Sequence, residues 1–359
     1  MIVDLFAGPG GWDEGLAWLG RRDVVGVEWD ASACATAEAA GHARIHADVS
    51  KLDPVALVAA STRPPWTPHV EGLIASPPCQ AWSAAGKRLG ELDRVNCHTL
   101  ADRMASGDDT TDWCDWHDAR SPLIAQPVRW VRDLTPDWIA LEEVPAVADY
   151  WRHLATIFTG WGYRVWTGVV NAADYGVPQT RKRAILLAHR LRPVGRPHTT
   201  HSRTPSLFER PWVTMAEAIG FGFDGPSATV SGGGTDTGGA EVFGNADYRR
   251  RLAAIGFPRR DETDPTRYRE RDLFPIDGPA PTVTEKARSW KHWDRSPDGP
   301  PMFAESVRVT VEQAAALQSF PRDYPWQGTK TRKSRQIGDA VPPLLAARML
   351  ESLGVGSLS

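Results

Sequence analysis

Short apolar runs, separated by stretches of helical periodicity, constrain the fold of this chain more than any other feature. The first four runs are continuously apolar, which predicts buried parallel strands of βαβ units. The last two lie close together and predict an antiparallel pair at the far edge of the same sheet. The runs cover residues 1–7, 24–29, 70–75, 138–144, 163–170 and 184–188. We therefore expect an α/β fold built on a doubly wound, mostly parallel sheet.

This regular pattern breaks at about residue 190 and returns at about residue 306. Residues 191–305 are rich in Pro, Gly and Arg, but aromatic and apolar residues persist throughout, so we expect a second, irregular domain rather than disorder. Beyond it, Thr310 and Gln313 have the spacing of a capping box, and prolines at 342–343 suit the first turn of a last helix. The expected organisation is an α/β domain at 1–190, the smaller domain at 191–305, and a return to the α/β domain at 306–359.

The composition is that of an ordinary water-soluble globular protein. Of the 359 residues, 42% are hydrophobic and 24% are charged. No apolar run approaches the roughly 18 residues of a membrane span, so we expect no membrane partner. The chain opens on a predicted strand rather than a signal peptide, and four cysteines in a chain of this length do not make a disulfide framework. These features predict a cytoplasmic location, in a prokaryotic or phage-host cell.

Charge is distributed unevenly along the chain. Residues 1–178 carry 14 Lys and Arg against 24 Asp and Glu, a balance of −10. Residues 179–359 carry 27 against 20, a balance of +7. The strips 179–203 and 328–336 are basic and contain no acidic residue. Such strips suit a surface that binds a polyanion, although charged runs are also common on plain solvated surface.

The first predicted strand leads into a glycine turn that opens a helix, starting at Gly8. Its glycine spacing is not that of the dinucleotide fingerprint, but glycines let the backbone approach a ligand closely. Glu28 ends the second strand, where an acid can accept both ribose hydroxyls of a nucleoside. Trp29 beside it can cover an adenine face, and Asp48 at a third strand end can accept the adenine amine. Each acid also suits an ordinary helix N-cap; together they predict an adenosine pocket without a phosphate clamp.

The segment Ser-Pro-Pro-Cys-Gln, residues 76–80, follows the third apolar run. Two consecutive prolines fix two φ angles and remove two backbone donors, so this elbow holds Cys79 at a defined place just past a strand end. The same elbow could equally close a strand and place a small thiol in the core. Glu142 ends the next strand on the same edge of the sheet, where a carboxyl near a cysteine can act as an acid.

Seven segments, in order, resemble the motifs of the DNA cytosine-5 methyltransferase family from residue 1 to about residue 350. This resemblance favours the catalytic interpretation of Cys79 over the core thiol. It implies a class I, Rossmann-like methyltransferase domain, with residues 191–305 as a target-recognition domain. The segments are "DLFAGPGG", "VEWD", "ASPPCQAWS", "LEEVP", "NAADYGVPQTRKR", "RVTVEQAAALQSFP" and "QIGDAVPP".

The resemblance also implies a reaction. S-adenosylmethionine would be the cofactor, and its methyl group would pass to carbon 5 of a flipped-out cytosine in duplex DNA. Cys79 would form a covalent adduct at carbon 6 while Glu142 protonates N3. Of the paired arginines Arg181 and Arg183, one would steady the flipped base and Glu142, and the other would meet a backbone phosphate; the flipped base is the expected partner of Arg181.

The family motifs further imply which residues bind the cofactor and the DNA. Residues 80–100 would form a mobile loop that closes over the DNA, and the clusters 249–251 and 267–271 would contact it. The expected cofactor residues are Phe6, Ala7, Gly8, Gly10, Glu28, Trp29, Asp48, Pro78, Asp339 and Val341. The expected DNA-binding residues are Gln80, Ser83, Lys87, Arg88, Arg249 and Arg250.

Double-stranded DNA is the expected partner of a monomeric enzyme, and a restriction endonuclease is a further partner that the resemblance allows. An RNA cytosine-5 methyltransferase on the same scaffold is one alternative. A DNA-binding regulator with an inactive methyltransferase fold is another, disfavoured by the intact Cys79, Glu142 and Arg181. A nicotinamide-dependent oxidoreductase is disfavoured by the glycine spacing.

The chain departs from the family pattern at three places. Glu143 and Asp339 stand where the family usually has asparagine, and either acid could change how the cofactor is held. The span 96–120 looks long and is acidic. It contains two cysteines and two histidines that could form half of a zinc site, but a solvated loop without metal is the favoured interpretation. These four residues are Cys97, His98, Cys114 and His117.

Overall fold

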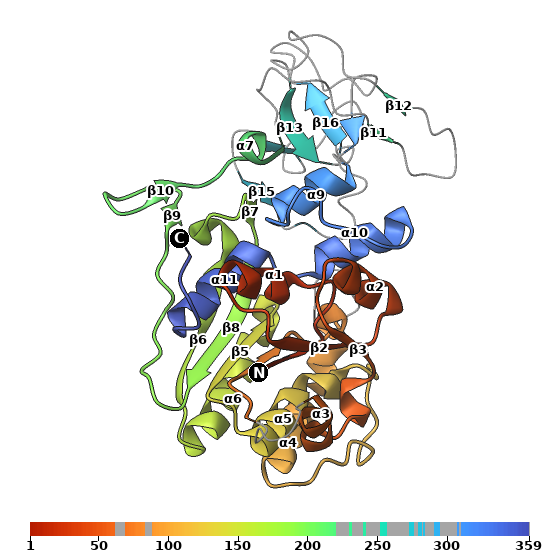
Figure 1. Cartoon of the computed structure of the whole chain (residues 1–359), viewed down its shortest axis with the longest axis vertical. Helices are drawn as coiled ribbons and strands as arrows, with labels where there is room; N and C mark the ends of the chain where they lie inside the picture. The colour runs from red at the N-terminus through yellow and green to blue at the C-terminus, as the bar shows by residue number, and fades with distance from the viewer. Residues whose placement is uncertain are drawn as a thin grey trace. The chain divides into compact units, whose positions relative to one another are not determined.

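The computed structural model divides the chain into two compact units, which we treat separately (Figure 1). The first unit comprises Met1–Val170, Lys182–His198 and Ala346–Ser359, and the second comprises Asn171–Arg181 and Thr199–Leu345. The structure describes residues 1–61, 69–82, 88–219, 230–231, 240–241, 252–256, 273–275, 279–281, 283, 291–294, 307–308 and 310–358.

A seven-stranded sheet forms the centre of the first unit, in the order β3-β2-β1-β4-β5-β8-β6. The strands β1, β2, β3, β4 and β5 run parallel to their neighbours, and β8 is antiparallel to β5. The predicted mostly parallel sheet is therefore confirmed, including the reversal near one edge. The strands are β1 Ile2–Leu5, β2 Val24–Glu28, β3 Arg44–His46, β4 Gly72–Ala75, β5 Trp138–Glu143, β6 Arg164–Asn171 and β8 Lys182–His189.

Helices cover both faces of this sheet, as a doubly wound fold requires. On one face, buried side chains of α3, α4, α5 and α6 pack in one hydrophobic cluster with alternate strand residues such as Val3, Leu5 and Leu73. Figure 1 shows α1, α2 and α11 together on the other side of the strands. The helices are α1 Gly11–Trp18, α2 Ala31–Ala39, α3 Pro54–Ser61, α4 Gly90–Ala105, α5 Gln126–Leu134, α6 Ala148–Gly160 and α11 Pro343–Ser352.

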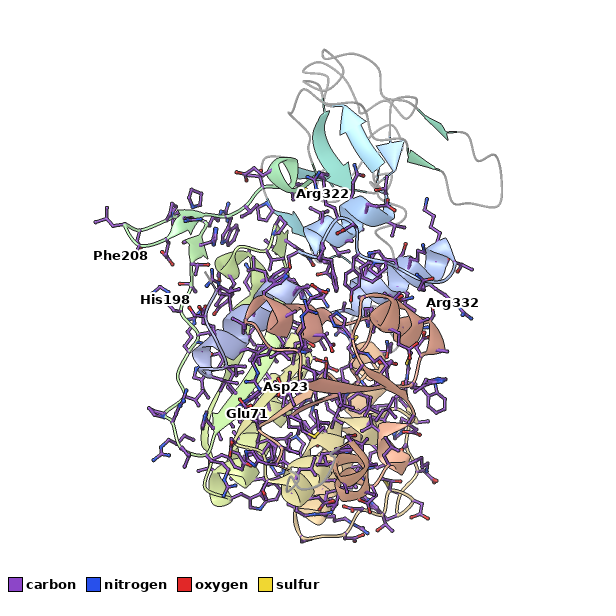
Figure 2. All side chains as sticks on the ribbon, viewed as in Figure 1. Asp23, Glu71, His198, Phe208, Arg322 and Arg332 are labelled. Carbon is purple, nitrogen blue, oxygen red and sulfur yellow. The ribbon has the colours of Figure 1, made fainter. Side chains whose placement is uncertain are left out.

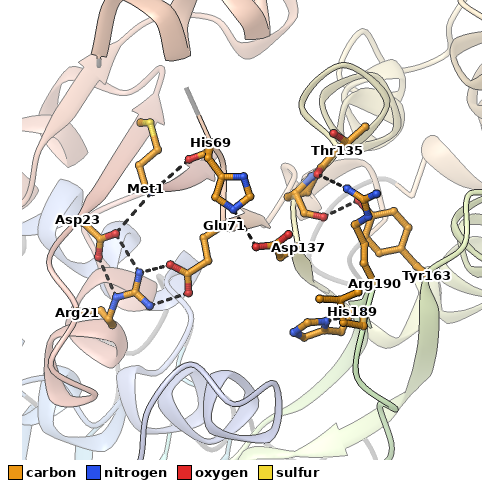
Figure 3. A network of polar contacts seen from close by, with 12 residues as sticks. Met1, Arg21, Asp23, His69, Glu71, Thr135, Asp137, Tyr163, His189 and Arg190 are labelled. Carbon is orange, nitrogen blue, oxygen red and sulfur yellow. Dashed lines mark hydrogen bonds and ion pairs between the residues drawn. The ribbon is translucent and has the colours of Figure 1, made fainter. Parts of the chain in front are cut away.

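The amino-terminal edge of the sheet is fastened by ion pairs (Figure 3). Arg21 contacts both carboxylate oxygens of Glu71 at 2.8 and 2.5 Å, and its Nε donates to Asp23 at 2.9 Å. These hydrogen bonds from Arg21 lower the pKa of both carboxyl groups. On the neighbouring strand, His69 lies 2.9 Å from Asp137, which directly precedes β5. This edge is occupied by structural charge pairs, and the opposite, carboxyl-terminal edge carries the predicted functional residues.

The second unit contains short strands and helices. Its largest sheet is antiparallel, in the order β14-β13-β16-β17. The predicted capping box at the start of α9 is present, with reciprocal hydrogen bonds between Thr310 and Gln313. The elements are β7 Gln179–Thr180, β9 His201–Ser202, β10 Arg210–Pro211, α7 Met215–Ile219, β11 Val230–Ser231, β12 Ala240–Glu241, β13 Leu252–Gly256, β14 Leu273–Pro275, β15 Ala280–Pro281, β16 Lys291–Asp294, β17 Val307–Arg308, α9 Val311–Leu317 and α10 Lys330–Asp339.

The predicted domain limits at 190 and 305 remain a prediction. The first unit leaves off at His198, and α9 and α10 belong to the second unit. Within that unit, Gln179 donates to Gln318 at 2.8 Å, and Gln318 donates to the carbonyl of Ile337 at 2.5 Å. Within the described residues, no helix is long and apolar enough to cross a membrane.

The span 96–120 is only partly the solvated loop that its acidic composition suggested. Its first ten residues complete α4, and the side chains of Cys97, Leu100 and Met104 are fully buried in the core. Apolar residues at helical spacing form the buried face of α4. The polar residues of its exposed face masked this pattern in the sequence. Only the part after Ala105 is irregular.

Gly72 should be essential for packing within the sheet. It lies beside Trp138 on the next strand, and a β-carbon at Gly72 would lie 2.1 Å from the buried indole ring. We expect Gly72→Ala to lower the free energy of unfolding by about 1–3 kcal/mol because a packed core has no room for the methyl group. Urea denaturation of Gly160→Ala, where the space is open, serves as the control; equal effects of the two changes would contradict this account.

Candidate active site

The glycine turn, residues 6–10, connects β1 to α1 at the carboxyl edge of the sheet. Phe6 has φ of 58°, a value that bulky residues rarely adopt, and Gly8 and Gly10 have φ of 56° and 110°. Three left-handed residues in five fold the turn back on itself, so that its backbone faces the sheet edge. A strained non-glycine residue at such a place is typical of a binding site.

Glu28 holds this turn from the end of β2. Its Oε2 accepts the amide of Gly8 at 2.8 Å, and its Oε1 accepts the amide of Asp30 at 2.7 Å. Each carboxylate oxygen keeps a second lone pair, so Glu28 can still accept a pair of hydroxyl groups. Beside it, the side chain of Trp29 is 71% exposed. An exposed indole next to a fixed carboxylate suits the adenine and ribose of a nucleoside.

Asp48 lies beyond the end of β3 and caps the short helix Val49–Lys51. Its Oδ1 accepts the amide and the hydroxyl of Ser50 at 2.9 and 2.7 Å. The N-cap interpretation of this acid is therefore correct for one oxygen. A role for Asp48 toward adenine remains a prediction that depends on its other oxygen.

Sequence reasoning missed Asp4, which lies on β1 directly before the glycine turn. Its side chain is completely buried, and neither carboxylate oxygen has a hydrogen-bond partner among the described residues. Burial raises the pKa of Asp4 well above its usual value, with a further contribution from Asp13, while Arg44 opposes the shift. A buried carboxyl group without a partner is costly, which favours a functional role. Its place inside the "DLFAGPGG" motif was the available signal.

Cys79 occupies the first position of a single helical turn, Cys79–Ala81, immediately after the double proline. Pro78 has φ of −60° and ψ of 116°, the extended conformation that an elbow of this kind requires. The elbow is anchored at Ser76, whose hydroxyl accepts the indole N–H of buried Trp12 at 3.0 Å. The thiol itself is only partly buried, so Cys79 is not a core residue.

Glu142 and Arg183 form the best-defined ion pair of the site. They lie on the antiparallel strands β5 and β8, and the Nε of Arg183 is 2.7 Å from Oε1 of Glu142. The side chains are 7% and 10% exposed, so the pair is shielded from water but reachable from the sheet edge. Because β4 and β5 pair in parallel with Ala75 opposite Leu141, the Cys79 elbow and Glu142 leave the sheet at the same edge.

Glu143 lies on the opposite face of β5 from Glu142, since neighbouring strand residues alternate. Its side chain is 1% exposed and accepts the backbone amide of Val144. This acid therefore has a local structural contact where strand β5 ends. Its effect on the cofactor remains a prediction.

Arg181 has a different environment from Arg183. It belongs to the second unit, its side chain is buried, and its Nη1 donates to the carbonyls of Val283 and Gly338 at 3.2 and 3.0 Å. In the described contacts Arg183 is the partner of Glu142. Arg181 directly precedes β8 and contacts carbonyls of its own unit, and its role toward the flipped base remains a prediction.

Only some of the remaining predicted site residues lie within the described part of the chain. Asp339 ends α10 and Val341 follows it, both in the second unit. Gln80 lies in the Cys79 turn, and Arg88 is exposed with φ of 54°. The other predicted DNA contacts lie outside the described residues: Ser83, Lys87, Arg249, Arg250 and the basic clusters 249–251 and 267–271.

Two of the four residues considered for zinc make contacts of another kind. Cys97 is buried and donates to the carbonyl of Ser121 at 3.5 Å, and burial raises the pKa of its thiol well above the usual value. His117 lies 2.8 Å from the carboxylate of Asp93. No cluster of three or more metal-ligating side chains occurs in the described parts of the chain.

A second feature that sequence reasoning missed is Arg120, in the segment after α4. Arg120 pairs with Asp118 at 2.7 Å, and these hydrogen bonds raise the pKa of the guanidinium, with a smaller contribution from the charge of Cys79. Arg120 therefore lies within electrostatic reach of the Cys79 thiol. The acidic character of the neighbouring residues concealed this arginine.

Comparison with known families decides the identity of this site. The model of the C-5 cytosine-specific DNA methylase family matches residues 1–102, 112–210 and 286–354. The chain belongs to this family. It is thus a DNA methyltransferase that uses S-adenosylmethionine, as the motifs predicted.

The curated relatives of this DNA methylase are bacterial modification enzymes. It is 27% identical to the type II methyltransferase M.DdeI of Desulfomicrobium norvegicum, over 98% of this chain and 88% of the relative. It is 28% identical to M.XorII of Xanthomonas oryzae pv. oryzae, over 96% of this chain and 82% of the relative.

Solved structures of similar fold include a DNA modification methyltransferase encoded within an E. coli prophage, with a TM-score of 0.59 and 20% identity. A variant of DNMT2 from Spodoptera frugiperda has a TM-score of 0.61 and 14% identity. The first covers 98% of both chains, and the second covers 98% of this chain and 99% of its own. At these identities the likeness concerns the fold alone.

The family match has two gaps, which correspond to unusual parts of this methylase. One gap, 103–111, falls inside the span that looked long for the family. The other, 211–285, lies inside the predicted target-recognition domain, 191–305. Its role in recognition remains a prediction.

The residues of the first unit fit S-adenosylmethionine. The glycine turn offers close backbone approach, Glu28 offers acceptors for hydroxyl groups, and exposed Trp29 offers an aromatic face. Asp4 adds a buried carboxyl group without a hydrogen-bond partner in the described chain, directly before this turn.

Asp4 should make the stability of the protein depend on pH. Because the pKa of Asp4 is raised in the folded state, the contribution of this group to the stability of the folded protein is fully present below the unfolded pKa of about 3.9. That contribution is lost as the pH rises through the folded pKa. We expect Asp4→Asn to unfold at a higher temperature than the wild type, with a difference that grows with pH. Thermal unfolding between pH 5 and about pH 9 measures this.

Asp23→Asn is the matched control for this series, because hydrogen bonds from Arg21 lower the pKa of Asp23. Its contribution to stability is present above the unfolded pKa, so the substitution should destabilise the protein at neutral pH. A difference between Asp4→Asn and the wild type that stays constant with pH would show that Asp4 does not titrate as described.

Proposed function

We propose that this methylase transfers a methyl group from S-adenosylmethionine to carbon 5 of a flipped-out cytosine in duplex DNA, through a covalent Cys79 adduct at carbon 6. The observation that carries the proposal is the arrangement at the carboxyl edge of the sheet. A partly exposed cysteine on a proline elbow leaves one strand, and a shielded Glu142–Arg183 pair ends the next. Nucleophile, acid and fixing cation are the parts that activation of a pyrimidine ring needs.

Cys79 acts as the nucleophile once its thiol has lost a proton. Addition of the thiolate to carbon 6 breaks the 5,6 double bond and makes carbon 5 electron-rich, while negative charge develops toward N3. S-adenosylmethionine, when bound, supplies a methyl group on a sulfonium sulfur for that carbon to take. Loss of the proton from carbon 5 then restores the double bond and expels the thiolate of Cys79, which leaves the enzyme unchanged.

Glu142 supplies the proton that N3 takes up during addition and receives it again during elimination. Arg183 engages Oε1 and fixes the orientation of the carboxyl group, and Oε2 makes no hydrogen bond within the described part of the chain. Arg183 is therefore a positioning residue for the carboxyl group that meets the base.

The basic strip on α10 of the second unit suits duplex DNA as a partner. The exposed side of α10 carries Arg332 and Arg335, and Figure 2 shows Arg332 extending away from the helix. Lys333 lies in the same basic strip, and the ion pair of Arg335 with Asp339 is long, 3.5 Å, and exposed. Cations held this loosely remain available to phosphates. We infer that this strip helps to hold DNA while a base is flipped into the site.

We further infer that the enzyme acts on cellular DNA in the cytoplasm, as a monomer, with a restriction endonuclease as a functional partner. The support is the bacterial type II modification enzymes among its relatives. An RNA substrate is the main alternative, and methylation of duplex DNA and tRNA measured side by side distinguishes the two.

Cys79→Ser should abolish methyl transfer to duplex DNA while the affinity for S-adenosylmethionine changes little, because the nucleophile lies outside the glycine turn. Radioactive methyl transfer and calorimetry measure the two properties. Duplex DNA with 5-fluorocytosine at the target should form a stable covalent complex with the wild type, since fluorine cannot leave as a proton does. Substantial product from the serine variant would contradict the covalent mechanism.

The two arginines should respond differently to conservative change. Arg183→Lys removes the planar contact with Glu142, and we expect kcat to fall about 100-fold with little change in unfolding temperature. Arg181→Lys weakens the contacts with two buried carbonyls, so we expect lower thermal stability and a smaller loss of kcat. The reverse pattern would return the catalytic role to Arg181.

A further inference from the structure

Three residues lie in one row across the first three strands of the sheet. The strand register places Asp4 of β1 opposite Gly26 of β2, and Gly26 opposite Arg44 of β3. Side chains at paired positions project from the same face of a sheet. Because Gly26 has no side chain, the space above β2 is free for the long side chain of Arg44.

Arg44 fills that space completely. A β-carbon at Gly26 would lie 2.3 Å from Nη1 of Arg44 and 2.9 Å from the β-carbon of Ala7. The side chain of Arg44 is 0% exposed although it carries a full charge. The glycine at this position is therefore required for the arginine to cross the strand.

The guanidinium of Arg44 reaches the glycine turn and the helix that follows it. Its Nη1 and Nη2 bind the two carboxylate oxygens of Asp13 on α1, at 3.0 and 2.7 Å. Its Nε donates to the carbonyl of Gly8 at 3.3 Å, and Nη2 lies 3.5 Å from the carbonyl of Ala7. A buried bidentate pair with further hydrogen bonds is a rigid arrangement.

The peptide groups on either side of Gly8 are consequently held from two directions. The amide of Gly8 donates to Glu28 at the end of β2, and its carbonyl accepts from Arg44 of β3. Gly8 has φ of 56°, and no atom lies within 4 Å of the position that a β-carbon would take, so side-chain packing does not restrain it there. Two side chains from neighbouring strands therefore help to hold the turn, together with the backbone hydrogen bond from Ala7 to Val27.

We propose that Arg44 is a positioning residue for the cofactor: through the gap left by Gly26 it fixes the glycine turn in the conformation that binds S-adenosylmethionine. The inference rests on the proposed function, since it concerns the same reaction. Arg44 does not touch the reacting atoms and acts through Gly8 and Asp13. Its loss should therefore weaken cofactor binding more than it slows the methyl transfer of the saturated enzyme.

Arg44→Lys tests this with little change of charge, because lysine cannot reproduce the two-pronged contact with Asp13 or the bond to Gly8. We expect the Kd for S-adenosylmethionine measured by calorimetry, and the KM for it, to rise about tenfold, with kcat at saturating cofactor within about twofold of the wild type. The KM for DNA should not change.

Gly26→Ala provides an independent test because it leaves Arg44 in place but removes its space. It should raise the Kd for S-adenosylmethionine in the same way as Arg44→Lys. Arg21→Lys is the matched control: it also breaks a two-pronged arginine–carboxylate pair in the first unit, at the opposite edge of the sheet. This control should lower the unfolding temperature without changing the Kd.

Two outcomes would overturn the proposal. One is an unchanged Kd in both Arg44→Lys and Gly26→Ala. The other is an equal rise of Kd in Arg21→Lys, which would show a general effect of stability. Failure of the proposed function appears separately, because the wild type itself would then bind no S-adenosylmethionine or methylate no DNA.

Discussion

The ion pair between Glu142 and Arg183 is the interaction on which the active site depends. It exists because β8 runs antiparallel to β5, so that a residue near the start of β8 lies beside the end of β5. A parallel strand at this place would have put its first residues at the opposite edge of the sheet. The single reversal in a mostly parallel sheet thus brings a cation to the edge where the nucleophile and the acid emerge.

The two edges of the sheet divide structural and functional charge between them. At the amino-terminal edge, Arg21 neutralises two carboxylates in one network. At the other edge the carboxyl groups are less completely matched: Arg44 neutralises Asp13, whereas Asp4 has no partner in the described chain. A buried carboxyl group without a partner costs stability, and so does a strained turn. Such costs are typical of a binding site.

Much of the fold could be predicted from the sequence because buried parallel strands are continuously apolar and each ends in a chemically distinct residue. The elbow at Cys79 and the turn at Gly8 follow from local rules for proline and glycine, and both are where the pattern put them. Long-range contacts such as the buried amide pair of Gln179 with Gln318 could not be predicted, because they join residues 139 positions apart. Which of Arg181 and Arg183 pairs with Glu142 was also beyond local rules, since the pairing depends on the antiparallel register of β5 and β8.

Arg44 shows most clearly what a sequence pattern conceals. In sequence it is a lone basic residue in a three-residue strand, 31 positions from Asp13 and 36 from Gly8. Only the register of three strands reveals that Gly26 lies between Arg44 and the turn that it holds. A glycine inside a strand usually weakens the strand, and here it makes room for a buried cation. The glycine turn is therefore held in place by residues outside its sequence motif, which a search for motifs alone does not find.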